Sequence, residues 1–129
     1  MRVFKNTWFS RFARKEKISD KELFNLISRL EERQAETDMG GNVYKLRQAR
    51  SGEGKRSGYR VIVFFKSKFR TFFVYGFSKS NKENIDEGEL NVFKVRAKDS
   101  FSLTDDQINA RIKKRTLIEI FKETDHEKI

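Results

Sequence analysis

At the start of the chain, the apolar residues are spaced first as in a β-strand and then as in a helix. Residues 2–5 are typical of a short strand, and residues 7–16 follow as a helix. Its inner face is formed by Trp8, Phe9 and Phe12, and we expect Trp8 to be a core anchor.

A second helix is predicted over residues 19–33. Ser19 and Glu22 form a capping-box pair at its start, and the turn residues of "ETDMGG" end it. Its apolar positions recur at helical spacing: Leu23, Ile27 and Leu30.

The middle of the chain changes to strand patterns. Residues 43–48 alternate between apolar and polar positions, as in a half-buried strand. Residues 59–65 and 71–77 are rich in β-branched and aromatic residues, and the polar segment between them is typical of a hairpin connection. Both runs are apolar on both faces, so we expect central strands covered by helices.

The last third returns to helical patterns. Residues 84–101 carry apolar positions at helical spacing, and residues 116–121 fit either a helix or a short strand. We expect residues 104–129 to form a C-terminal helical extension with a frayed tail. Two capping pairs mark the helix starts: Asp86 with Glu89, and Thr104 with Gln107.

The predicted order of elements is β-α-α-β-β-β-α-α. This order favours an α+β fold, a small antiparallel sheet with helices packed on it. A length of 129 residues predicts a single domain.

Positive charge is concentrated in one third of the chain. The net charge is +10, and residues 45–82 contain eleven Lys or Arg and one acid, whereas the rest contains eighteen of each sign. A local basic patch of this kind is typical of proteins that bind polyanions. The alternative is a solvated surface that keeps the protein soluble.

The composition of the chain argues against several other kinds of protein and of site. The chain has no cysteine, no stretch of membrane-spanning length and no secretory pattern at its start, so we expect a cytoplasmic protein without membrane contact. Its one histidine, His126, lies in the predicted tail, which leaves little for a histidine base or a zinc site. We expect no metal and no cofactor.

The basic patch centres on "KLRQARSGEGKRSGYR", residues 45–60, a glycine-rich loop between two predicted strands. It is not a nucleotide-binding P-loop, because the spacing differs and a strand follows instead of a helix. Lys45 and Arg47 share one face of the first strand, and Arg60 begins the next. In a hairpin register these three converge beside the loop cations Arg50, Lys55 and Arg56.

Phe77 and Lys79 end the third strand of this meander with the same parity. A ring flanked by cations suits RNA, because bases stack on the ring and phosphates pair with the cations. The alternative is a core Phe77 beside a solubilising Lys79.

The block "VYKLRQARSGEGKRSGYRVIVFF", followed by "FVYGFSKSNKENI", closely resembles the RelE-superfamily toxins of bacterial toxin–antitoxin systems, nearest to the HigB-like branch. The match is densest over residues 42–85. It departs from the usual pattern at Ser57, which replaces a glycine, and at Glu53, which places an acid in the loop.

The resemblance implies a small domain that cleaves mRNA at the translating ribosome. It also implies a cognate antitoxin, expected to be a helix-turn-helix DNA-binding protein, with operator DNA bound only through the complex. The implied catalytic residues are Lys45, Arg47, Arg60 and Lys79, and the implied RNA-binding residues are Arg50, Lys55, Arg56 and Phe77.

The hypothesis for the reaction is attack of a ribose 2′-hydroxyl on the adjacent phosphate, without a metal. Arginines would bind the phosphate oxygens, and one of Lys45, Lys55 or Lys79 would act as the base, its pKa lowered by neighbouring cations. Two alternatives remain: a non-catalytic RNA- or DNA-binding module, and a ParE-like poison of DNA gyrase.

Overall fold

A computed structural model describes residues 1–33, 37–49, 58–78 and 84–122. The elements are, in chain order, β1 (Arg2–Asn6), α1 (Thr7–Glu16), α2 (Asp20–Glu31), β2 (Thr37–Asp38), β3 (Val43–Gln48), β4 (Tyr59–Lys66), β5 (Arg70–Ser78), α3 (Glu87–Ser102), α4 (Asp105–Lys113) and β6 (Leu117–Ile120). The strands form one sheet in the order β2-β3-β4-β5-β1-β6. The fold is α+β, as the sequence predicted.

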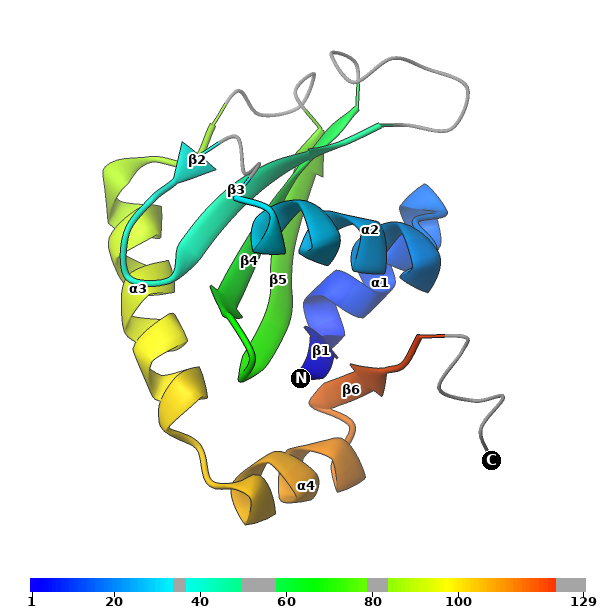
Figure 1. The fold of residues 1–129 in the computed structure, drawn as a ribbon, viewed down its shortest axis with the longest axis vertical. Helices are drawn as coiled ribbons and strands as arrows, with labels where there is room; N and C mark the ends of the chain where they lie inside the picture. Colours follow the sequence, from blue (N-terminus) through cyan, green and yellow to red (C-terminus); the bar gives the residue numbers. More distant parts are fainter. Residues whose placement is uncertain (34–36, 50–57, 79–83, 123–129) are drawn as a thin grey trace.

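Helices cover both faces of this sheet, with α1 and α2 against one face and α3 and α4 against the other (Figure 1). The two central strands β4 and β5 are buried along most of their length because they have helices on both sides. The doubly apolar runs in the sequence therefore marked the central strands correctly.

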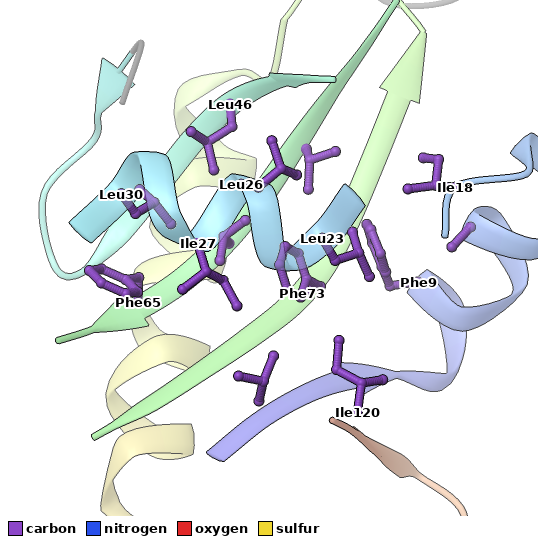
Figure 2. Close-up of a cluster of buried hydrophobic side chains, with 14 of the residues drawn as sticks. Phe9, Ile18, Leu23, Leu26, Ile27, Leu30, Leu46, Phe65, Phe73 and Ile120 are labelled. Atoms are coloured by element: carbon purple, nitrogen blue, oxygen red, sulfur yellow. The ribbon is translucent and has the colours of Figure 1, made fainter. Parts of the chain in front are cut away.

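The first core cluster lies between the sheet and the helices α1 and α2. Figure 2 shows Leu23, Ile27 and Leu30 of α2 directed toward the strands, as their helical spacing predicted. Phe9 of α1 packs against Phe73 of β5, with ring centroids 5.5 Å apart.

The second core cluster lies between the opposite face of the sheet and α3 and α4. Its buried residues include Ile62 and Phe64 of β4, Ala97 of α3 and Ile108 of α4. Phe93 of α3 is partly buried and packs edge-on against Phe64.

Side-chain caps begin three of the helices where the sequence predicted them. Asp86 and Thr104 each form a complete capping box, at α3 and α4. Ser19 accepts a hydrogen bond from the Glu22 amide at the start of α2, so it is the predicted cap. The Glu22 carboxylate instead accepts from the Gln48 side chain of β3 at 2.9 Å, which ties α2 to the sheet.

Three features of the sheet differ from the predicted order. Residues 37–38 form the short strand β2, and residues 117–120 form β6, which pairs with β1 at the sheet edge. The sequence left residues 116–121 open between a helix and a short strand, and the structure has the strand there, within the expected C-terminal extension. The pairing of β1 with β5 is parallel, so the sheet is mixed and mostly antiparallel.

Trp8 is not the core anchor that the helical pattern predicted. Its side chain is 45% exposed, whereas Phe9 beside it is fully buried. Trp8 lies at the border of the apolar face of α1 and rests on Phe12 and Tyr75.

A β-bulge interrupts the pairing of β4 with β5. Ile62 pairs with Tyr75 and Val63 with Phe73, so Val74 is the extra residue. Before the bulge, the even-numbered Phe72 lies on the face of the second core cluster. Beyond the bulge, the odd-numbered residues of β5 lie on that face instead. The bulge thereby places Tyr75 and Phe77 on the same face as Arg60.

Candidate functional site

Three residues on neighbouring strands form a row across one end of the sheet. Arg47 of β3 pairs with Arg60 of β4, and Arg60 pairs with Phe77 of β5. We call these three residues the cationic row. Like charges directly opposite each other destabilise a sheet, so an arginine pair in this position is suited to share a bound anion.

The two arginines differ in exposure. Arg60 is 7% exposed, whereas Arg47 is exposed. The Arg60 guanidinium is thus held largely within the sheet surface, and that of Arg47 reaches solvent beside it. Such a pair combines a fixed donor with an accessible one, which suits a phosphate group.

Lys45 lies one residue pair further along β3, on the same face as the cationic row. Partial burial lowers the pKa of Lys45, and the positive charges of Arg60 and Arg47 lower it further. Its ammonium donates a hydrogen bond to the Asn84 side-chain oxygen at 3.1 Å. Lys45 is therefore a lysine with an increased tendency to be neutral, held in a defined position.

Asn84 is a residue of this site that the sequence reasoning missed. Its side-chain oxygen also accepts from the amide of Ile85 at 2.9 Å, so it is positioned from both sides. An asparagine just before a helix cap is a common turn signal, and that signal alone does not indicate contact with a lysine 39 positions earlier.

The helix α2 positions the end of β3 that carries Arg47. The Arg29 guanidinium donates to the Arg47 carbonyl at 2.6 Å, and Gln48 is bound to Glu22 as described above. The backbone around Arg47 is therefore fixed by α2, while its side chain stays exposed.

Gly58 allows the two strands to approach closely at this end. A Cβ at this position would lie 2.1 Å from the carbonyl oxygen of Gln48, which is backbone and cannot move aside. The position therefore requires glycine, and one glycine of the basic loop has a structural purpose.

Several predicted site residues lie outside the described residues: Arg50, Lys55, Arg56 and Lys79. Their roles stay predictions. The structure brings Lys45, Arg47 and Arg60 onto one face, as the hairpin register predicted.

Phe77 lies next to Arg60, and its side chain is 5% exposed within the second core cluster. It is therefore a packing residue in this structure. Stacking of a base on Phe77 stays a prediction, and it would require the ring to become uncovered.

Within the described residues, no group of three or more His, Cys, Asp or Glu side chains is placed to hold a metal ion. None of the described helices is long and apolar enough to cross a membrane.

The fold and the site define a small, basic α+β protein with a row of cations at one end of its sheet. The family model described as "RelE toxin of RelE / RelB toxin-antitoxin system" matches residues 1–120. The chain therefore belongs to the RelE toxin family and is the toxin of a toxin–antitoxin system, with a cognate antitoxin as its partner. No curated protein matches the chain in a sequence search.

Proposed function

We propose that this toxin is an endoribonuclease that cleaves mRNA at the translating ribosome and thereby inhibits translation. The observation that carries the proposal is the arrangement of Arg47 and Arg60 as directly paired neighbours, with Lys45 beside them on the same face. Cleavage by a ribose hydroxyl needs a proton acceptor and groups that stabilise charge on the phosphate, and a lysine of lowered pKa with two guanidinium groups can supply both.

In the proposed reaction the ribose 2′-oxygen attacks the adjacent phosphorus, and the bond to the 5′-oxygen of the next nucleotide breaks. Neutral Lys45 accepts the 2′-hydroxyl proton, and the leaving 5′-oxygen takes a proton from water. The products are a 2′,3′-cyclic phosphate and a 5′-hydroxyl. Because the nucleophile belongs to the substrate, the protein's task is to orient it and to stabilise charge.

Arg60 and Arg47 bind the non-bridging phosphate oxygens in this proposal. Negative charge grows on these oxygens in the transition state, so donors already in position stabilise it more than the ground state. The burial of Arg60 strengthens the effect, since the local dielectric is lower than in water.

The ribosome would complete the orientation of the mRNA. In the described part of the chain Lys45 is the acid–base group that the site offers beside its two arginines, so exact placement of the 2′-hydroxyl has to come from elsewhere. A ribosome that holds the mRNA would supply that placement.

The test is translation of a defined mRNA in a cell-free system with the purified toxin, followed by mapping of new 5′ ends. A parallel reaction contains the same mRNA without ribosomes. We expect cuts only in the reaction with ribosomes, with 5′-hydroxyl and cyclic phosphate ends. RNA that stays intact while translation continues would contradict the proposal, and cuts without ribosomes would contradict its ribosome dependence.

Arg60→Lys is the variant that tests the site, because it keeps the charge and loses the bidentate geometry. We expect the cleavage rate to fall by about 10²- to 10³-fold, as for loss of a transition-state donor. Lys66→Ala is the matched control, an exposed cation at the other end of β4. An Arg60→Lys toxin that is folded by circular dichroism and cleaves at the wild-type rate would exclude Arg60 from catalysis.

A further inference from the structure

The helix α1 carries a stripe of aromatic and basic side chains that the candidate site does not use. Trp8, Arg11, Phe12 and Lys15 are spaced three or four positions apart, so they lie along one side of the helix. Arg11 and Lys15 are exposed, and Trp8 is 45% exposed. We call these four residues the α1 stripe.

The α1 stripe borders the last part of β5. The pairing of β1 with β5 ends at Lys5 and Phe73, so among the described strands only β4 lies beside β5 beyond its bulge. A hollow of about 540 Å³ lies here, between the α1 stripe and the residues from Tyr75 to Ser78. Figure 1 shows α1 leaving β1 alongside β5.

Aromatic rings form the wall of this hollow. The ring centroids of Trp8 and Tyr75 are 4.6 Å apart, and those of Trp8 and Phe12 are 5.4 Å apart. Gly76 makes this packing possible, since a Cβ there would lie 2.3 Å from the Phe12 ring. The wall is therefore a continuous aromatic surface whose exposed edge is Trp8.

The hollow and the candidate functional site share the residue Phe77 of β5. Phe77 lines the hollow and also pairs with Arg60 across the strands. Tyr75, the partner of Trp8, pairs with Ile62, which in turn pairs with Lys45. An extended chain bound at the cationic row would have to cross the end of β5 to reach the hollow.

We propose that this hollow is a second RNA subsite, which binds a nucleotide of the mRNA next to the one that is cut. The inference rests on the proposed function and extends the same substrate path. A base stacks against the exposed aromatic surface of Trp8 and Tyr75, and the flanking phosphates pair with Arg11 and Lys15.

The exposed aromatic ring beside the cations favours RNA over an acidic peptide as the occupant of the hollow. The acid that lines it, Glu16, accepts a hydrogen bond from the Tyr59 hydroxyl, so its carboxylate is engaged at the side of the first core cluster. The exposed cations combined with a large exposed ring match a base with its phosphate.

Trp8 provides a direct probe, since it is the only tryptophan of the chain. The ligand is a single-stranded RNA with 2′-O-methyl riboses, which has the bases and phosphates of mRNA but no free 2′-hydroxyl. We expect saturable quenching of the tryptophan fluorescence on titration. An abasic oligonucleotide of equal charge should bind more weakly and leave the fluorescence unchanged.

Variants measure the contribution to affinity, with binding followed by the anisotropy of labelled RNA. We expect Trp8→Ala to weaken binding by about 5- to 100-fold and Trp8→Phe by less, since a ring remains. Arg11→Ala with Lys15→Ala should weaken binding and reduce its salt dependence. The matched control is Arg111→Ala with Lys113→Ala, two exposed cations of α4. Thermal melts verify that each variant is folded.

The outcomes separate this inference from the proposed function. The subsite alone would be overturned by three results together. The wild-type toxin cleaves mRNA, its tryptophan fluorescence does not change with RNA, and folded Trp8→Ala binds RNA as tightly as the wild type. Quenching by the 2′-O-methyl RNA, together with intact mRNA in the cell-free translation reaction, would support the subsite and overturn the nuclease. Equal quenching by a polyglutamate peptide and by RNA would overturn base stacking and identify an acidic protein segment as the occupant.

Discussion

At the scale of single residues, Lys45 shows how sheet geometry changes the chemistry of a side chain. Its partial burial and its two arginine neighbours act in the same direction, because each disfavours the charged ammonium. The hydrogen bond to Asn84 holds the nitrogen in place without adding a negative charge. The lowered pKa makes Lys45 better suited than an ordinary lysine to accept a proton.

The pH dependence of cleavage tests this role. In the wild type the rate should rise with pH and level off above the lowered pKa of Lys45, because only the neutral amine accepts a proton. Lys45→Arg keeps the charge but cannot become neutral, so we expect a loss of about 10²- to 10⁴-fold and no such plateau. The measurement is the single-turnover cleavage rate on ribosome-bound mRNA across pH.

Lys66→Arg is the control for that series, because Lys66 is exposed and lies at the far end of β4. Should Lys45→Arg retain both the wild-type rate and the wild-type profile, the base would have to be sought among Lys55 and Lys79.

The shared face of the three described cations was predictable from the sequence, and the reason is register. Parity along residues 43–48 and the position of Arg60 after the loop were enough to place three cations on one face. The exposure of Trp8 and the contact from Asn84 were not predictable, since both depend on how distant elements pack.

At the scale of elements, Arg70 connects the start of β5 to the junction of α3 and α4. It is 4% exposed and donates to the Leu103 carbonyl at 2.6 Å and to the Asp105 carboxylate at 3.0 Å. The C-terminal end of α3 and the start of α4 are thus held against the sheet by one side chain.

Loss of Arg70 should therefore destabilise the fold. We expect Arg70→Ala to lower the free energy of unfolding by about 1–3 kcal/mol, because the part-buried Leu103 carbonyl loses its donor. Asp105→Asn is the matched control and should cost about 0–1 kcal/mol, since that carboxylate is exposed. Urea unfolding followed by circular dichroism measures both values, and equal losses would contradict the assignment.

The helices were predictable at this scale and the sheet was less so. The caps at Asp86 and Thr104 are local signals, which a sequence displays directly. The bulge at Val74 and the strand β6 depend on pairing with distant strands, which no local pattern specifies. The bulge is also the feature that places Tyr75 and Phe77 on the face of the site.

At the scale of the whole molecule, the uneven charge predicts strong sensitivity to salt. The net charge of +10 arises within residues 45–82, and the described cations of the site lie on one face of the sheet. Association with RNA should release counterions for each phosphate that a cation contacts.

The salt dependence of RNA binding therefore measures how many phosphates the cations contact. For single-stranded RNA the slope of log K against log salt is about −0.7 for each neutralised phosphate, so Arg47→Gln should make it shallower by about 0.7. Lys98→Gln, at an exposed position on α3, should leave the slope unchanged. RNA anisotropy titrations at several KCl concentrations provide the measurement. Equal slopes in wild type and Arg47→Gln would argue against a phosphate contact there.

The pairing of β1 with β6 has a consequence for how the molecule folds. Arg2 and Glu119 form a bidentate ion pair across these strands, with both contacts at 2.9 Å, between positions 117 apart in sequence. Contacts of such separation raise the contact order and slow folding. The strand β1 also lacks one of its two neighbours until residues 117–120 pair with it. The sheet as described is therefore complete only when strands from distant parts of the sequence have come together.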